Sequence, residues 1–186
     1  LHGIKPITGA EITLTGGSDR EEDRATVGDW IAIDPQTQRI AALYPRKSLF
    51  KRRNAGKTNR VQLIAANVDT VFIVTSANMD FNVARLERYL ALAFEAGVTP
   101  VIVITKADLA EDAESYAEAA RAMRPDLAVL TVNARSADVA GSLFLWLVKG
   151  QTIALMGSSG VGKSTLVNAL MGESVQDTGG IREDDA

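Results

Sequence analysis

Residues 153–170 read IALMGSSGVGKSTLVNAL, and their order of hydrophobic, glycine-rich and amphipathic parts determines the class of fold. The middle part fits the pattern G-x-x-x-x-G-K-[ST], the Walker A motif or P-loop. Its residues are Gly157, Ser158, Ser159, Gly160, Val161, Gly162, Lys163 and Ser164. A chance Gly/Ser turn is the alternative, but a hydrophobic strand before the loop and an amphipathic helix after it are the flanks that the motif needs. The pattern predicts a nucleoside triphosphate site.

The residue types of this loop suit phosphate binding. Glycines let the backbone wrap so that its N–H groups point at phosphate oxygens, and the following helix N-terminus adds its positive end. Lys163 would reach the β- and γ-phosphates, and the Ser164 hydroxyl would ligate Mg²⁺. We therefore predict nucleotide binding from Gly157 through Thr165, with Lys163 and Ser164 as the catalytic candidates.

Segments typical of strands and helices alternate before the P-loop. Residues 68–75 (VDTVFIVT) form a nearly continuous β-branched run, as expected for a strand buried on both faces. Asn82 can cap a helix that runs to Ala96 and stops at Gly97. The remaining expected elements are a strand at 101–104, a helix at 111–124, a strand at 127–132, a helix at 139–148, a strand at 152–156 and a helix at 162–172. This alternation predicts an α/β domain with a parallel sheet and helices on both faces.

A second motif, T-K-A-D, follows the strand at 101–104. It consists of Thr105, Lys106, Ala107 and Asp108. Ligands of open parallel sheets bind at the carboxyl ends of the strands, so this motif can share a crevice with the P-loop. The Asp108 carboxylate can accept hydrogen bonds from guanine N1–H and the 2-amino group, a donor pair that adenine lacks. Taken alone, the motif also fits a solvated loop or a helix cap; together with the P-loop it favours a guanine nucleotide.

The composition excludes several classes of protein. The 186 residues include no Cys and one His, which excludes disulfides, Cys-ligated zinc and thiol catalysis in this chain and argues against a His-based triad. The length fits one domain, or one domain with a small module. No apolar run reaches the ~18–20 residues of a membrane span, and no secretory signal is present. We expect a cytoplasmic, monomeric protein without a membrane partner.

The first 60 residues differ from the rest. Short β-like pieces at 12–14, 27–33 and 39–44 are separated by turns and predict part of a small β-barrel. A basic linker at 45–60 then holds seven Lys and Arg and no acid, although the whole chain has a formal charge of −3. This linker fits contact with nucleic-acid phosphates, and a solvated connector is the alternative. We expect one domain over 1–60, barrel and linker together, and a nucleotide-binding domain over 61–186.

The motifs together resemble those of a GTPase in an unusual order. T-K-A-D resembles the guanine motif [NT]-K-x-D, and Asn133, Ala134 and Arg135 resemble the second base-contacting loop. There the Ala134 N–H would meet guanine O6, and Asn133 stands where Ser is usual. In ordinary GTPases the P-loop comes first, whereas here residues 105–108 precede residues 157–164. This order resembles that of a circularly permuted GTPase.

Several short stretches of the sequence are similar to those of the ribosome small-subunit-dependent GTPase A family, the EngC-type permuted GTPases. The matching stretches are TVGDW at 26–30, PRKSLFKRR at 45–53, IAANVD at 64–69, RLERYL at 85–90 and GGIREDD at 179–185. The resemblance implies an OB-fold barrel, GTP and GDP with Mg²⁺ as ligands, and GTP hydrolysis stimulated by the small ribosomal subunit during late maturation. It also favours ribosomal RNA contact through Arg46, Lys47, Lys51, Arg52 and Arg53.

Some family features have no counterpart in these residues. The family's zinc-binding domain, the rest of its first switch and its D-x-P-G segment are missing, and the chain has no Cys. We therefore expect a permuted GTPase domain that binds guanine nucleotides but hydrolyses GTP poorly, with the strand at 152–156 at a sheet edge. Two alternatives stay open: a P-loop ATPase or kinase in which T-K-A-D is incidental, and an RNA-binding barrel with a degenerate nucleotide domain.

Overall fold

The computed structural model describes residues 24–53 and 61–172. The chain divides into two compact units, Leu1–Asn67 and Val68–Ala186. This division falls later than the boundary expected after residue 60, because residues 61–66 form a strand that pairs within the first unit.

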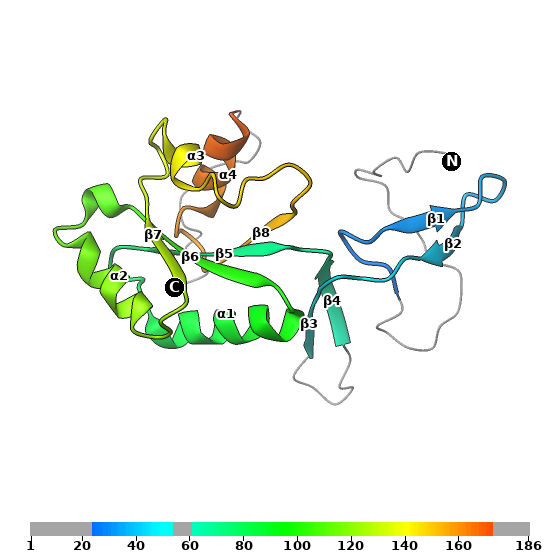
Figure 1. Cartoon of the computed structure of the whole chain (residues 1–186), viewed down its shortest axis with the longest axis horizontal. Coiled ribbons are helices and arrows are strands. Elements are labelled where there is room, and N and C mark those ends of the chain that lie inside the picture. The colour runs from blue at the N-terminus through cyan, green and yellow to red at the C-terminus, as the bar shows by residue number, and fades with distance from the viewer. Residues whose placement is uncertain (1–23, 54–60, 173–186) are drawn as a thin grey trace. The chain divides into compact units, whose positions relative to one another are not determined.

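The second unit is built on a parallel sheet, as the sequence predicts (Figure 1). Its strands are β5 (Thr70–Ser76), β6 (Thr99–Thr105), β7 (Ala128–Thr131) and β8 (Ile153–Met156), in the spatial order β7-β6-β5-β8. The chain runs outward from β5 to β7 and then returns to the other side of β5. Such a reversal is a switch point, beside which α/β sheets bind their ligands. Within the described residues β8 lies at an edge, as expected for the strand at 152–156.

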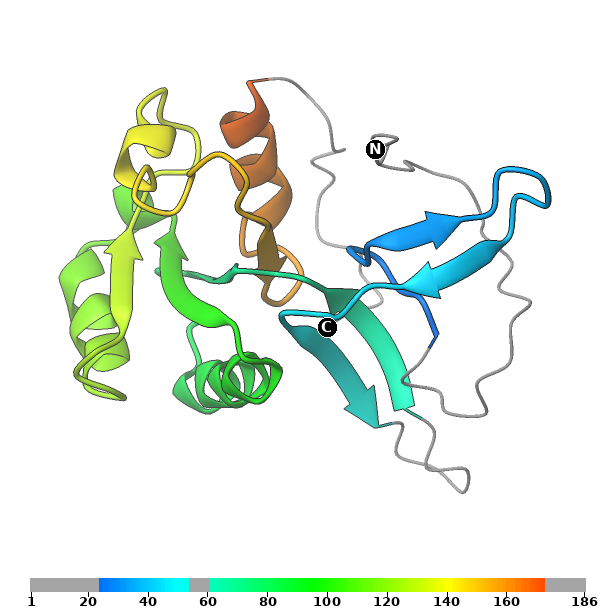
Figure 2. The same cartoon turned by 45° about the vertical axis from the view of Figure 1, so that its right-hand side comes forward.

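Helices cover both faces of this sheet (Figures 1 and 2). On one face, α1 (Val83–Ala96) and α2 (Ala113–Arg121) contact the strands. On the other face lie α3 (Val139–Ser142) and α4 (Lys163–Met171), and one buried cluster joins both to β5 and β6. All seven residues of β5 are consequently buried, which explains its unbroken hydrophobic run.

The ends of α1 match the prediction, and α2 is shorter than predicted. Asn82 accepts a hydrogen bond from the Arg85 N–H at 2.9 Å, and Gly97 ends α1 in the left-handed region at φ 72°. The helix expected over 111–124 begins only after Asp112, whose carboxylate accepts from the Ser115 N–H. An Asp cap thus sets the start of α2.

The prediction of a helix over 139–148 is wrong beyond its first turn. α3 ends at Ser142, and successive turns follow, in which the Trp146 N–H donates to the Leu143 carbonyl. Gly141 weakens a helix here. The turns bring Trp146 edge-on to Phe72, with ring centroids 6.3 Å apart. Packing onto the sheet therefore overrides the helical pattern.

The described part of the first unit consists of two antiparallel pairs. β1 (Ile31–Ile33) pairs with β2 (Ile40–Leu43), and β3 (Leu49–Arg53) pairs with β4 (Val61–Ala66). These pairs are consistent with the expected partial barrel. Part of the expected basic linker is therefore a strand, β3. The expected strand at 12–14 lies outside the described residues.

Residues from separate sequence motifs meet in the first unit. The Arg46 guanidinium binds the Asp29 carboxylate through two hydrogen bonds of 2.7 and 2.8 Å, and the Asp29 side chain is only 1% exposed. Asn67 donates to the Gly28 carbonyl at 2.9 Å. Gly28 has a φ of 89°, and a Cβ there would lie 2.1 Å from the Ala66 carbonyl oxygen. The stretches at 26–30, 45–53 and 64–69, which resemble those of the family, therefore contact one another and stabilise the first unit.

None of the helices within residues 24–53 and 61–172 is long and apolar enough to cross a membrane.

Candidate nucleotide-binding site

Strand register brings the predicted motifs to one edge of the sheet. Ser76 at the end of β5 pairs with Thr105 at the end of β6, and β7 ends one pair earlier, at Thr131. β8 stops lower, because its last residue, Met156, pairs with Ile73. The P-loop, which follows β8, therefore has room to wrap beside the carboxyl end of β5.

The path of the P-loop requires glycine. Gly160 and Gly162 have left-handed φ values of 74° and 93°. A Cβ on Gly157 would lie 2.2 Å from the Val74 carbonyl oxygen, so the loop starts in direct contact with β5. Gly162 is also the N-cap of α4 and offers no side chain to the first-turn N–H groups. This arrangement presents the positive end of the helix to the loop and suits an anionic ligand.

Lys163 lies against the same loop. Its ammonium group donates to the Gly157 carbonyl at 2.9 Å and to the Ser158 carbonyl. Burial lowers the pKa of Lys163, because the charged ammonium loses solvation. Ser164 and Thr165 follow in the first turn of α4 and are half-buried. The predicted phosphate-binding residues are thus gathered at one place.

Thr105 connects the two motifs directly. Its side chain is completely buried. Its hydroxyl oxygen lies 2.6 Å from the Val161 carbonyl oxygen and 3.1 Å from that of Thr75. A Cβ on Gly162 would lie only 3.3 Å from the same hydroxyl. A buried polar contact therefore fixes T-K-A-D relative to the P-loop.

The rest of T-K-A-D turns outward. Lys106 has a left-handed φ of 58°, which is uncommon without glycine, and leads into the 3₁₀ helix η2 (Ala107–Leu109). Asp108 is exposed, and its carboxylate forms no hydrogen bond or ion pair with another residue of the described ranges. It caps no helix, since Lys106 precedes η2 and Asp112 caps α2. Its acceptor oxygens are therefore open to a ligand.

The loop after β7 lies at the same edge. The Val132 N–H donates to the Ile104 carbonyl at 2.8 Å, which continues the pairing of β6 and β7. The Asn133 side chain accepts a hydrogen bond from the Arg135 N–H at 2.9 Å. Asn133 therefore shapes the turn around the buried Ala134, while Arg135 is exposed.

Comparisons with known proteins agree with this geometry. Residues 43–186 match the model of the family described as RsgA GTPase. The chain belongs to the RsgA GTPase family. It is 57% identical over 163 residues to the small ribosomal subunit biogenesis GTPase RsgA of Mesorhizobium japonicum, covering 86% of this chain and 47% of that protein. It is 53% identical over 161 residues to RsgA 2 of Vibrio parahaemolyticus, covering 87% of this chain and 45% of that protein. The chain spans about half the length of these RsgA relatives.

Solved structures extend the RsgA comparison to the fold. The crystal structure of YjeQ from Thermotoga maritima matches with a TM-score of 0.63 and 26% identity, covering 81% of this chain and 52% of that one. YloQ, described as a circularly permuted GTPase, matches with a TM-score of 0.57 and 26% identity, over 81% of this chain and 51% of YloQ. These matches confirm the prediction of a circularly permuted GTPase fold.

The donor set of this candidate site suits Mg²⁺. Within residues 24–53 and 61–172 no group of three or more His, Cys, Asp or Glu could hold a metal ion. Mg²⁺ at a P-loop takes most of its ligands from phosphates and water and needs one Ser or Thr hydroxyl from the loop. Ser164 stands at that position. Nothing in the described part of the chain supplies a zinc ligand set.

One contact of the P-loop is not predictable from the sequence pattern. Arg85 of α1 donates from its Nη1 to the Ser158 hydroxyl oxygen at 2.8 Å. The two residues are 73 positions apart, so no local spacing relates them. The only signal is that Arg85 belongs to RLERYL, a stretch that resembles the family.

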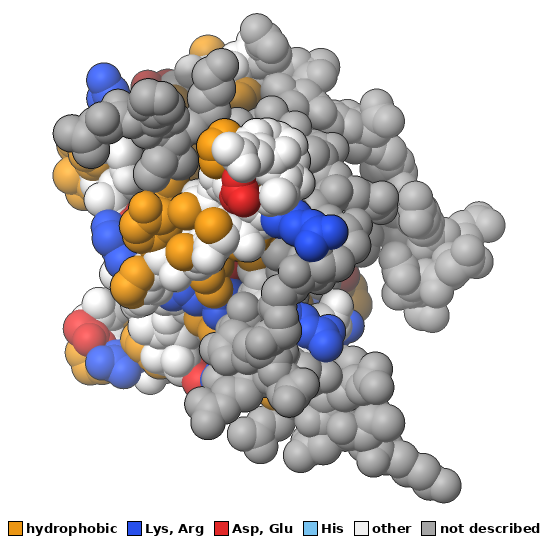
Figure 3. Space-filling model, turned by 90° about the vertical axis from the view of Figure 1, so that its right-hand side faces the viewer, with side chains coloured by type: hydrophobic (Ala, Val, Ile, Leu, Met, Phe, Trp, Pro, Cys, Tyr) orange, Lys and Arg blue, Asp and Glu red, His pale blue; other side chains and the backbone are white. Residues whose placement is uncertain are grey.

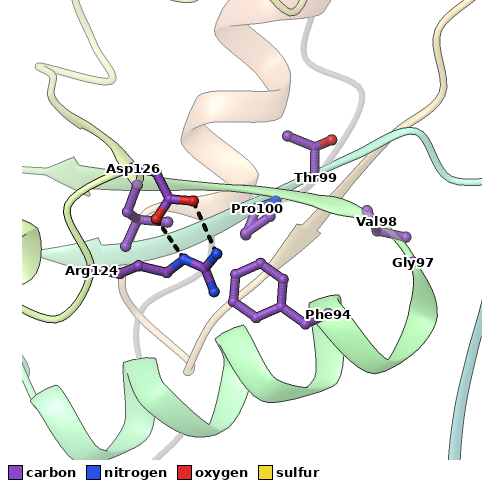
Figure 4. Close-up of a pocket in the computed structure, with 8 residues that line it drawn as sticks. Phe94, Gly97, Val98, Thr99, Pro100, Arg124 and Asp126 are labelled. Atoms are coloured by element: carbon purple, nitrogen blue, oxygen red, sulfur yellow. Dashed lines mark hydrogen bonds and ion pairs between the residues drawn. The ribbon is translucent and has the colours of Figure 1, made fainter.

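A separate hollow lies at the opposite edge of the sheet, where β6 begins (Figure 4). Arg124 binds Asp126 through two hydrogen bonds, and its guanidinium lies 4.6 Å from the centre of the Phe94 ring. This pairing raises the pKa of Arg124 and lowers that of Asp126. Because its charges are already paired and no motif residue lines it, this hollow is not the nucleotide site.

Proposed function

We propose that this chain binds GTP and GDP with Mg²⁺ at the edge formed by the P-loop, T-K-A-D and residues 133–135. The observation that supports this most is the buried contact between Thr105 and Val161, because it holds a guanine-type motif at a phosphate loop. On association with the small ribosomal subunit, the protein would hydrolyse GTP to GDP and assist late maturation of that subunit. The names of the RsgA relatives support this role.

Each binding residue has a distinct part in the proposal. Lys163 exchanges its carbonyl partners for the β- and γ-phosphate oxygens, and the first turn of α4 adds N–H donors. The Asp108 carboxylate accepts hydrogen bonds from guanine N1–H and the 2-amino group, and the Ala134 N–H faces guanine O6. Mg²⁺, when held at Ser164, neutralises phosphate charge. Positioning and charge stabilisation are the main requirements of phosphoryl transfer.

Nucleotide titration by calorimetry tests the binding proposal. GDP and a non-hydrolysable GTP analogue should bind in the presence of Mg²⁺, and ADP should bind far more weakly. Asp108→Ala should abolish the preference, whereas Glu118→Ala, which removes an exposed acid on α2, should leave it unchanged. Equal or tighter binding of ADP would support a P-loop ATPase instead.

We also propose that this chain alone hydrolyses GTP slowly. The P-loop, T-K-A-D and residues 133–135 would bind phosphate and base, and none of these residues would orient the attacking water. A single-turnover assay should give a rate well below that of a full-length relative. Equal rates would contradict the proposal.

Ribosomal RNA contact is proposed for the basic strand β3, through Lys51, Arg52 and Arg53. Arg52 is exposed and donates to the Gln62 side chain at 2.8 Å. Lys47, in the turn before β3, is also exposed. Arg46 is not part of this proposal, because Asp29 neutralises it. Lys and Arg side chains are exposed on the face that Figure 3 shows, and the RNA proposal rests on the sequence of β3.

Charge reversal tests the RNA contact. Arg52→Glu combined with Arg53→Glu should weaken binding to the small subunit and reduce its dependence on salt. Arg39→Glu, an exposed arginine beside β2, is the matched control. Equal affinities and salt slopes for wild type and the double variant would refute the contact.

We further propose that the protein acts in the cytoplasm as a monomer. Light scattering after size-exclusion chromatography would check the monomeric state.

A further inference from the structure

The P-loop is held from outside the sheet by a side chain of α1. Arg85 is half-buried, and its Nη1 donates to the Ser158 hydroxyl oxygen at 2.8 Å. A guanidinium keeps its charge at any physiological pH, and a hydrogen bond from a charged donor is stronger than a neutral one. The second residue of the P-loop is therefore tied to a helix that contributes nothing else to the predicted site.

α1 holds the backbone of Arg85 in a fixed position. Asn82 caps the helix by accepting the N–H of Arg85 itself at 2.9 Å. The neighbouring Leu86 is 2% exposed, and Leu90 one turn later is also buried. α1 also contacts β5 and β6. The cap at Asn82 and the packing of α1 both hold the backbone of Arg85 in place. Its side chain can therefore restrict the movement of Ser158 in the P-loop.

Ser158 contacts two cationic side chains through different atoms. Its carbonyl oxygen accepts from the Lys163 ammonium, and its hydroxyl oxygen accepts from Arg85. When Lys163 turns to a phosphate, the Ser158 carbonyl loses that donor. The contact between Arg85 and the hydroxyl involves neither Lys163 nor the phosphates, so it persists.

We infer that Arg85 is a positioning residue of the P-loop: it holds Ser158 in place while Lys163 moves between loop and nucleotide. This role rests on the proposed binding of guanine nucleotides at the same loop. Arg85 is not proposed to touch either phosphate or base. It acts through Ser158, and it preserves the loop shape that the phosphates require.

A calorimetric and kinetic series tests the inference. Arg85→Ala should weaken GDP binding about tenfold, which corresponds to about 1.4 kcal/mol. This value is near the lower end of the free-energy cost of losing a hydrogen bond from a charged group. It should also speed GDP release. Arg85→Lys, which can still donate one hydrogen bond, should recover part of the loss. Arg88→Ala is the matched control, because Arg88 is an exposed arginine on the same helix and lies over the Tyr89 ring.

A double-mutant cycle separates positioning from general loss of charge. Ser158→Ala removes the acceptor, so adding Arg85→Ala to it should cause little further loss. Independent losses that multiply in the double variant would overturn the inference, as would equal GDP affinities for Arg85→Ala and Arg88→Ala.

Hydrogen exchange without nucleotide provides a second readout. Amides of residues 157–162 should exchange faster in Arg85→Ala than in wild type or Arg88→Ala, while those of β5 and β6 keep their protection. Unchanged exchange in the loop would refute the positioning role. Absence of GDP binding by the wild-type chain would refute the proposed function instead, so the two failures are distinguishable.

Discussion

Replacing Thr105 by valine tests the link between the base motif and the P-loop. Valine keeps the shape of threonine and exchanges the hydroxyl for a methyl group. The side chain is fully buried, so no water can substitute for the lost donor. The Val161 carbonyl, now 2.6 Å from the hydroxyl oxygen, would lose its partner and would have to move away from the methyl carbon. A buried polar group left without a partner costs roughly 1–3 kcal/mol, so we expect a loss of about 2 kcal/mol in stability.

Urea unfolding followed by tryptophan fluorescence measures this loss. Trp146 packs on Phe72 in the same unit, so a Trp30→Phe background leaves it as the reporter. Thr105→Ser keeps the hydroxyl and should stay within about 1 kcal/mol of wild type, the value of a lost methyl group. Thr105→Val should also weaken GDP binding, because the base and phosphate sites would no longer be held together. A change in stability of less than about 0.5 kcal/mol for Thr105→Val, well under the cost of an unpaired buried carbonyl, would show that this hydroxyl does not link the two motifs.

Three further results are expected. Arg46→Ala should destabilise the first unit by about 3–5 kcal/mol in urea unfolding, since it leaves the buried Asp29 carboxylate unpaired; a loss typical of a surface pair, under about 1 kcal/mol, would contradict this. Gly157→Ala should weaken GDP binding more than tenfold in titrations, because its Cβ would lie 2.2 Å from the Val74 carbonyl oxygen. The lowered pKa of Lys163 means that its charge is lost at a lower pH than for an ordinary lysine, so GDP affinity should fall as pH rises through that range. Lys163→Arg stays charged and should show only the fall caused by deprotonation of guanine itself; parallel pH profiles for the two proteins would argue against the effect.

Local signals predicted the fold of the second unit well. The buried run at 68–75 corresponds to β5, and the cap at Asn82 and stop at Gly97 frame α1 as expected. The glycine spacing of the P-loop is itself a backbone requirement, so the motif carries its own geometry. Because parallel strands share their carboxyl edge, placing T-K-A-D after a strand was enough to bring it near the loop.

Contacts between distant residues account for what could not be predicted. The helical pattern at 143–148 gives way to turns because Trp146 packs on Phe72, which lies far away in the sequence. Arg46 belongs to a run of basic residues without a nearby acid, yet its partner Asp29 lies 17 residues earlier. Charge counting within one segment could not show that part of the positive charge of this run is balanced by a distant acid.

A change of nucleotide base is a direct test of the proposal that Asp108 selects guanine at this P-loop. In Asp108→Asn the amide keeps one acceptor for a ring N–H and gains a donor, which fits the 2-oxo group of xanthine better than the 2-amino group of guanine. In calorimetric titrations with Mg²⁺, Asp108→Asn should bind xanthosine diphosphate more tightly than wild type does and GDP more weakly. A variant that had merely lost its fold would not bind xanthosine diphosphate more tightly than wild type does. Unchanged affinities for both nucleotides would show that Asp108 does not select the base.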